Sequence, residues 1–214
     1  MKEEVKTKTE KKKGITLKRL IIFVFILVMA IGLIIGVKWR ILYNIQELND
    51  SKRMETQWYY HSEADSTIMD VYRKGSIYKT KLKQKGKDVA LTYWENKQTG
   101  EAYVFFENPT KKYHRAEGGI ITDLPMMEYY TEDEKVRVQM AAMPNIIITT
   151  GKYGEKDCYI ISGFGGKEYI EKATGLVLAT QHNNEETRKI NYEFRTITDE
   201  EIAMPDINQY EIIE

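Results

Sequence analysis

The hydropathy pattern of the chain is dominated by one uninterrupted apolar run near the N-terminus. From Leu20 to Val37 the chain reads LIIFVFILVMAIGLIIGV, 18 residues without a charge. As a helix this run is roughly 27 Å long, which is close to the hydrocarbon thickness of a bilayer. The pattern therefore predicts a transmembrane helix over residues 20–37.

Basic residues flank this run unequally. Eight Lys or Arg side chains lie within residues 1–19, and Lys38–Arg40 supplies two cations and a tryptophan on the other side. Such flanks are typical of a helix that meets lipid headgroups, and the side with more positive charge stays in the cytoplasm. We expect a cytoplasmic tail over residues 1–19 and an extracytoplasmic C-terminal domain in the cell membrane.

A cleaved signal peptide is the alternative for the same segment, because Val28-Met29-Ala30 offers small residues at a cleavage spacing. The apolar run continues well beyond this point, which favours an uncleaved anchor. Within the run, Gly32 and Gly36 form G-x-x-x-G, a spacing that lets two helix backbones approach closely. The spacing motivates the hypothesis of a homodimer through the transmembrane helix.

Periodicity beyond the anchor predicts a helical neck and then a sheet. Residues 38–55 form the neck, with Ile41, Ile45 and Leu48 on one face. Residues 56–214 contain short segments rich in Tyr, Val, Ile and Thr, divided by turn residues about every ten positions. This cadence is typical of antiparallel meanders, one before and one after residues 123–143.

Alternation within single segments indicates which way their side chains point. In SIYKTKLK, which begins at Ser76, the three lysines Lys79, Lys81 and Lys83 share one side. We therefore expect one side of the sheet to face water.

The segment 123–143 reads as helix, and it contains four of the nine methionines. These are either ordinary core residues or the lining of an adaptable apolar cavity, because Met accepts ligands of varied shape. Large aromatic residues on predicted strands are the other candidates for such a lining. The candidate ligand-binding residues are Trp58, Trp94, Met126, Met127, Met140 and Met143.

Charge and composition argue against several classes of function. Lys plus Arg and Asp plus Glu both number 32, but residues 1–40 carry a net charge of +7 and residues 41–214 carry −7. The basic part is explained by membrane orientation, so we expect no nucleic-acid partner. Cys158 is the only cysteine, which excludes an internal disulfide and a multi-thiolate metal site.

Catalytic groups are present in the sequence but are not arranged in a recognisable pattern. His61, His114 and His182 lie in separate predicted segments, and no paired-ligand spacing accompanies them. Cys158 lies within a predicted strand, where a small buried thiol is the usual case. We expect no enzyme, no metal and no cofactor.

The stretch from Gly166 to Leu178 reads GKEYIEKATGLVL, a strand that ends in charged residues, a Thr-Gly turn and a Leu-rich return strand. Together with the N-terminal membrane signal and the two meanders, it resembles the LolA-like superfamily of lipoprotein carriers and their Gram-positive relatives. The resemblance implies an α+β fold. It further implies that the transmembrane helix is followed by a curved antiparallel sheet, an open half-barrel whose concave face is covered by a helical insert and holds a lipid, an acyl chain or an apolar peptide.

Two functional hypotheses follow from this interpretation. The first is a single-pass membrane-anchored protein that binds a lipid or lipoprotein acyl chain in the half-barrel. The second is an envelope sensor or protein-interaction module without a lipid ligand. An enzyme acting on envelope material is a third possibility, but it needs a convergent acid, base or nucleophile that the pattern does not supply.

Overall fold

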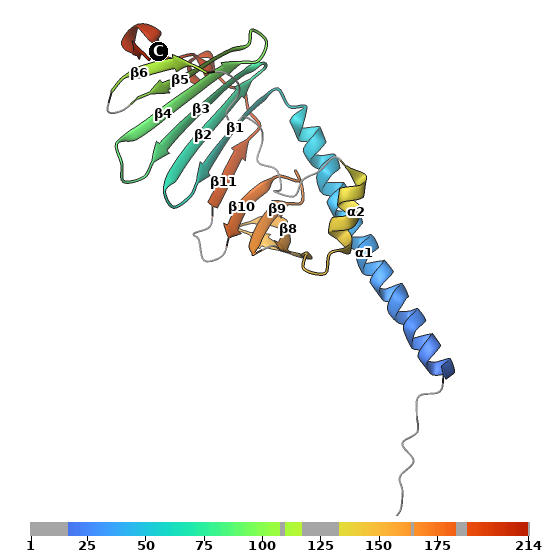
Figure 1. The fold of residues 1–214 in the computed structure, drawn as a ribbon. Helices are drawn as coiled ribbons and strands as arrows, with labels where there is room; N and C mark the ends of the chain where they lie inside the picture. Colours follow the sequence, from blue (N-terminus) through green and yellow to red (C-terminus); the bar gives the residue numbers. More distant parts are fainter. Residues whose placement is uncertain (1–16, 108–109, 117–132, 164, 183–187, 214) are drawn as a thin grey trace, which may run out of the picture.

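One long helix and one large sheet make up most of the protein (Figure 1). The computed structural model describes residues 17–107, 110–116, 133–163, 165–182 and 188–213. The helices are α1 (Leu17–Arg53), α2 (Glu134–Ala142) and α3 (Asp199–Ile202), followed by the 3-10 turn η1 (Ile207–Gln209). The strands are β1 (Gln57–Glu63), β2 (Thr67–Lys74), β3 (Ile77–Gln84), β4 (Val89–Asn96), β5 (Glu101–Phe106), β6 (Lys112–Arg115), β7 (Ile147–Tyr153), β8 (Lys156–Gly163), β9 (Gly166–Glu171), β10 (Val177–His182), β11 (Arg188–Glu193) and β12 (Glu211–Ile212).

The described strands form a single open sheet in the order β12-β6-β5-β4-β3-β2-β1-β11-β10-β9-β8-β7. Two antiparallel meanders, β1–β6 and β7–β11, are joined through β1, which pairs with β2 on one edge and with β11 on the other. The sheet is mixed, because β12 pairs in parallel with β6. The predicted α+β class, with an N-terminal apolar helix before a largely antiparallel sheet, is confirmed.

Helix α1 passes through two environments along its length. Its apolar first part is exposed almost throughout, whereas Leu42 and Ile45 in its second part are buried in the main core. Its 37 residues make it about 55 Å long. The exposed apolar part is long enough to cross a membrane. The expected span over residues 20–37 and most of the expected neck over 38–55 therefore lie in one continuous helix.

The second part of α1 packs directly on the turn between β9 and β10. Gly175 in this turn has φ of +72°, a left-handed conformation that favours glycine. A Cβ at this position would lie 2.7 Å from the carbonyl oxygen of Ile45 and 3.0 Å from the Cβ of Leu48. The turn and the helix are thus in contact through backbone as well as side chains.

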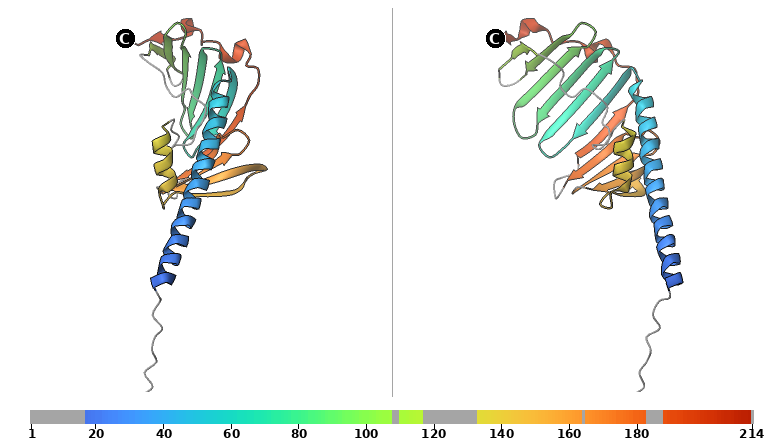
Figure 2. Two further views of the ribbon diagram at one scale, coloured as in Figure 1. Left: turned by 90° about the vertical axis from the view of Figure 1, so that its right-hand side faces the viewer. Right: turned by 45° about the vertical axis from the view of Figure 1, so that its right-hand side comes forward.

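Helix α2 packs alongside α1 and runs antiparallel to it (Figure 2). Near its start Arg137 donates a hydrogen bond to Gln46 of α1. Beyond its end the Nζ of Lys38 donates to the carbonyl oxygens of Met143, at 3.2 Å, and Ile146, at 2.6 Å. The helix expected over residues 123–143 is thus present from Glu134, and its earlier part lies outside the described residues.

The C-terminal segment covers the side of the sheet opposite α1. The Nζ of Lys79 donates to the carbonyl oxygen of Ala203 at 2.7 Å, and Trp94 donates to that of Ile202 at 3.0 Å. Lys79 is only 7% exposed. The expectation that the lysine side of β3 faces water is therefore wrong at Lys79, because the chain after β11 folds back over it.

We predict that Gly175→Ala destabilises the protein more than Gly100→Ala. Both glycines have φ of +72°, but an added Cβ meets nothing within 4 Å at Gly100, whereas at Gly175 it meets α1. The left-handed conformation alone costs about 1–2 kcal/mol, and overpacking against α1 adds about 1–3 kcal/mol. Denaturant unfolding of the two detergent-solubilised variants measures the loss in free energy of unfolding for each. Equal losses would show that α1 does not press on this turn.

Candidate functional site

Strand register assigns each side chain of the sheet to one of two sides. Trp58, Tyr60 and Val71 share a buried core with Leu42 and Ile45 of α1, and we call this the helix side. The opposite side is covered in part by residues 199–213, and we call it the tail side. Each side carries a different candidate surface.

Three of the predicted ligand residues belong to the core on the helix side. Trp58 is 1% exposed, and its ring centroid lies 5.8 Å from that of Tyr60. Met140 of α2 is 6% exposed in the same cluster, and Met143 packs against it half-buried. In the structure as it stands, these residues pack on one another.

Trp94, the fourth described candidate, lies on the tail side under the C-terminal segment. Its register partner on β3 is Lys79, whereas the helix-side residue Tyr78 pairs with the next residue of β4. The structure therefore does not bring Trp94 together with Trp58. Met126 and Met127 lie outside the described residues.

A row of apolar side chains crosses the helix side of the sheet. Met69 is paired with Leu82, Leu82 with Leu91, and Leu91 with Phe106, so the row spans β2 to β5. All four are half-buried. Cross-strand neighbours of this kind form a continuous surface about 14 Å long, which we call the apolar row. Sequence reasoning did not select these four residues.

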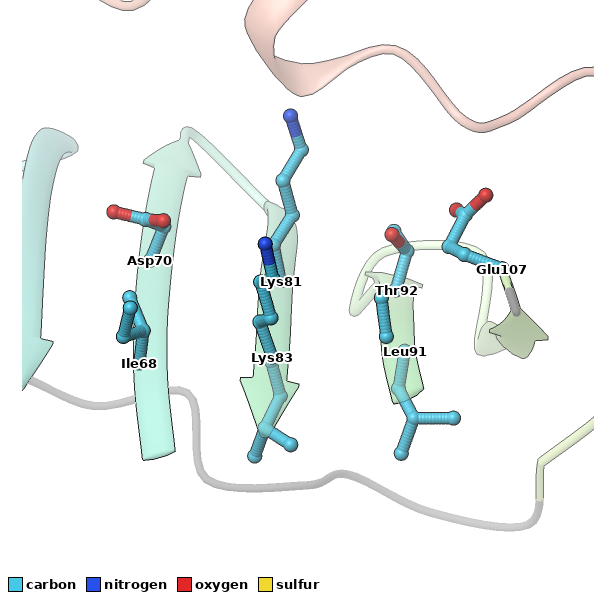
Figure 3. Close-up of a pocket in the computed structure, with 9 residues that line it drawn as sticks. Ile68, Asp70, Lys81, Lys83, Leu91, Thr92 and Glu107 are labelled. Carbon is cyan, nitrogen blue, oxygen red and sulfur yellow. The ribbon is translucent and has the colours of Figure 1, made fainter. Parts of the chain in front are cut away.

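The tail side carries a groove of about 350 Å³. In Figure 3 the side chains of Asp70, Lys81, Thr92 and Glu107 point toward the C-terminal segment, while Leu91 points away. The lining thus combines two carboxylates with lysine side chains. The residues that line it are Ile68, Asp70, Lys81, Leu82, Lys83, Ala90, Leu91, Thr92 and Glu107.

A hydrogen-bonded group holds Asp70 at one end of the groove. The Tyr59 hydroxyl donates to Asp70 Oδ1 at 2.7 Å, and His61 Nδ1 lies 2.8 Å from the same oxygen. Burial and the bond to Asp70 raise the pKa of Tyr59 above its usual value. The phenol therefore stays a donor at neutral pH, and Asp70 is fixed in position.

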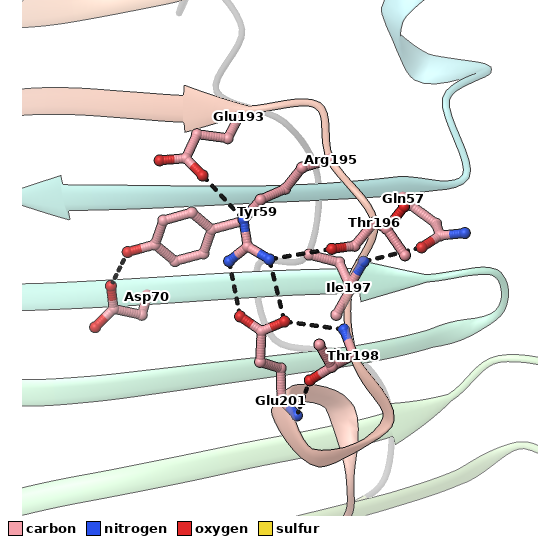
Figure 4. A network of polar contacts seen from close by, with 9 residues as sticks. All are labelled: Gln57, Tyr59, Asp70, Glu193, Arg195, Thr196, Ile197, Thr198 and Glu201. Atoms are coloured by element: carbon pink, nitrogen blue, oxygen red, sulfur yellow. Dashed lines mark hydrogen bonds and ion pairs between the residues drawn. The ribbon is translucent and has the colours of Figure 1, made fainter.

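Arg195 fastens the C-terminal segment over the tail side (Figure 4). Its guanidinium donates to both carboxylate oxygens of Glu201, at 3.1 and 2.7 Å, and to Glu193 at 2.9 Å. Glu201 also closes a capping box with Thr198 at the start of α3. The pKa of Glu201 is lowered to about 2, mainly by the hydrogen bond from Arg195. The pair is therefore charged throughout the physiological range.

Two observations on the described residues concern metal binding and the reactivity of the thiol. Within the described ranges no group of three or more His, Cys, Asp or Glu side chains could hold a metal ion. Cys158 is buried, and burial raises the pKa of its thiol, which disfavours the nucleophilic thiolate.

Gly32 and Gly36 lie in the exposed apolar part of α1. An added Cβ would meet nothing within 4 Å at either position. The surface at G-x-x-x-G is thus open, and self-association through it stays a hypothesis.

Comparison of the sequence with protein-family models and with curated proteins gives no significant match. Among solved structures, the chain is similar to PNGF-II in the C2 space group, with a TM-score of 0.30 and 13% identity, and in the P21 space group, with 0.31 and 12%. Each alignment covers 73% of this chain and 30% or 31% of PNGF-II, so this chain spans less than a third of that protein's length. A likeness at this TM-score carries no argument about fold or function.

The groove residues were missed because they are dispersed along the chain. Asp70, Lys81 and Thr92 lie on three strands, and only the hairpin registers place them side by side. The one available signal was the lysine alternation in β3, which correctly placed Lys81 and Lys83 on a common side.

We predict that the contribution of Lys79 to the stability of the protein rises between about pH 8 and pH 10.5. Burial, and then the charge of Lys81, lowers the pKa of Lys79 from 10.5 to about 8. In this interval the unfolded chain binds more protons than the folded one, so raising the pH favours folding, by at most about 1.4 kcal/mol per unit. Relative to Lys79→Met, the wild type should gain stability across this interval in denaturant titrations. The exposed Lys83→Met should follow the wild type. Parallel profiles for wild type and Lys79→Met would contradict the prediction.

Proposed function

We propose that the protein is a single-pass membrane protein that binds an apolar ligand, a lipid or a lipoprotein acyl chain, on the helix side of its sheet. Residues 1–19 lie in the cytoplasm and the sheet lies outside the cell membrane. The observation that carries the proposal is the apolar row, a continuous half-buried apolar surface beside a core built on the anchor helix itself.

The proposed ligand lies across β2 to β5, along the apolar row. Transfer of apolar surface out of water contributes about 0.8 kcal/mol for each buried methylene, so a linear chain along about 14 Å of surface gains several kcal/mol. The sheet acts as an open half-barrel, with the second part of α1 and α2 over its concave side. The resemblance of Gly166–Leu178 to LolA-like carriers supports the same ligand class.

Binding is proposed in place of catalysis. The one thiol is buried with a raised pKa, and the carboxylate Asp70 is engaged by Tyr59 and His61. The raised pKa disfavours the thiolate form of the cysteine, which is its nucleophilic form. Binding of an apolar ligand through buried surface requires no cofactor.

A partner protein at the groove is the second candidate function. The exposed Lys81 and Lys83 and the half-buried Asp70 and Glu107 give this groove charges of both signs, which suits a polar peptide segment. In this case the chain is an envelope sensor or interaction module, and Gly32 with Gly36 offers a surface for pairing two anchors.

Leu82 and Lys83 provide a matched pair of variants, because they are consecutive on β3 and point to opposite sides of the sheet.

To test for the apolar ligand, the full-length protein is reconstituted in liposomes that contain a diazirine-bearing acyl lipid. Photolysis should label peptides of β2 to β5 as well as α1. Labelling of α1 serves as the internal standard, since the anchor contacts lipid in every variant. Leu82→Gln should lower the labelling of β2 to β5 relative to α1 by roughly tenfold or more, because a buried leucine contributes about 1.5–3 kcal/mol.

Lys83→Gln should leave this ratio unchanged. Equal labelling of β2 to β5 in all three proteins, or none in the wild type, would refute the apolar ligand.

The second candidate function, a partner protein at the groove, is tested with a photoreactive amino acid at position 82 or position 83 in intact cells. A protein adduct from position 83 and none from position 82 would support a partner at the groove.

A further inference from the structure

The end of α2 and the start of β7 lie level with the end of the apolar run in α1. Lys38 is the first charged residue after Val37, and its Nζ bonds the carbonyl oxygens of Met143 and Ile146. These two residues lie directly after α2 and directly before β7. The link therefore holds this corner of the domain where α1 leaves the bilayer.

Contacts on both sides of Val37 support the same placement. Ile35, within the apolar run, packs against the main core half-buried, and so does Trp39 just beyond it. The ring of Trp39 stacks on the ring of Tyr43, with 5.6 Å between the two ring centroids. Tryptophan and tyrosine side chains are typical of the headgroup layer. The domain therefore contacts a residue inside the apolar run as well as the residues just after it.

The chemistry of the corner differs from that of the rest of the sheet domain. Residues 138–151 contain no charged side chain, although 30% of all residues are charged. Ile147 is 56% exposed within this stretch. Within the described residues, β7 pairs with β8 alone, so it is the edge of the sheet and presents unpaired backbone groups. Exposed edges are normally protected by charge, proline or a covering element, and among the described residues the first part of β7 pairs with no strand other than β8 and carries neither charge nor proline.

We infer that this corner, the end of α2 with the first part of β7, rests in the headgroup layer of the bilayer that α1 crosses. The lipid surface covers the apolar side chain of Ile147, and headgroups and interfacial water satisfy the free edge of β7. The occupant is a membrane because the corner is continuous with the anchor and is bonded to it at the point of exit. The inference rests on the membrane anchor proposed above, but not on the apolar ligand.

The consequence is a fixed orientation of the sheet relative to the membrane. Figures 1 and 2 show the hairpin of β7 and β8 beside the middle of α1, whereas the β6 and β12 edge lies at the far end of the domain. The β7 edge is therefore membrane-proximal and the β12 edge faces away from the bilayer.

Environment-sensitive labels on the full chain in liposomes test this placement. Cys158 is buried, so Cys158→Ser supplies a cysteine-free background. Ile147→Cys and Ile212→Cys then place one NBD label each on the two opposite edges, at isoleucines that are 56% and 64% exposed. Nitroxide lipids labelled at the headgroup or high on the acyl chain should quench the label at position 147, and its emission should shift to shorter wavelength.

The label at position 212 should show neither effect and should remain open to iodide in the water phase. Equal behaviour of the two labels, with both quenched by iodide and neither by nitroxide lipid, would overturn the inference. Carbonate extraction of the same samples separates the possible failures. A chain that carbonate extracts from the membrane lacks the anchor. A chain that stays in the membrane but exposes position 147 to water has the anchor, and its domain is held away from the bilayer surface.

Discussion

The packing of α1 into the sheet core is the constraint on which the rest of the structure depends. Helix α1 is apolar and largely exposed from Leu20 to Val37, and eight residues later Ile45 is fully buried. The turn at Gly175 is shaped to receive it, since any side chain there would collide with the helix backbone. Separation of the domain from this helix would expose its core, so the proposed anchor and the domain cannot move independently.

This arrangement assigns different physical environments to the two sides of the sheet. On the helix side, α1 and α2 build an apolar core whose margin is the apolar row. On the tail side, the return of the chain after β11 buries Trp94 and Lys79 and leaves a charged groove beside them. An apolar ligand therefore suits one side and a polar partner the other, which is why neighbouring residues of β3 can distinguish the two functions.

Local patterns were a good guide to the elements and a poor guide to their combination. Alternation and turn residues predicted the two antiparallel meanders on either side of residues 123–143, because each hairpin is decided within a few residues. The union of both meanders depends on β1 pairing with β11, two segments more than a hundred residues apart. The same limit applies to the candidate site. Trp58 and Trp94 are equivalent as aromatic residues on strands, yet the registers of three intervening hairpins put them on opposite sides.

The sequence by itself determined the apolar N-terminal helix, the strands with their turns, the uneven distribution of charge and the common side of Lys81 and Lys83. These follow from periodicities of a few residues and from composition, which local geometry translates directly into structure. Only the tertiary structure decided that the apolar helix continues into the core, that the C-terminal segment buries Lys79, and that four dispersed apolar residues form one row. Those outcomes arise from packing between distant segments, whose free energy depends on register and shape that no short stretch of sequence contains.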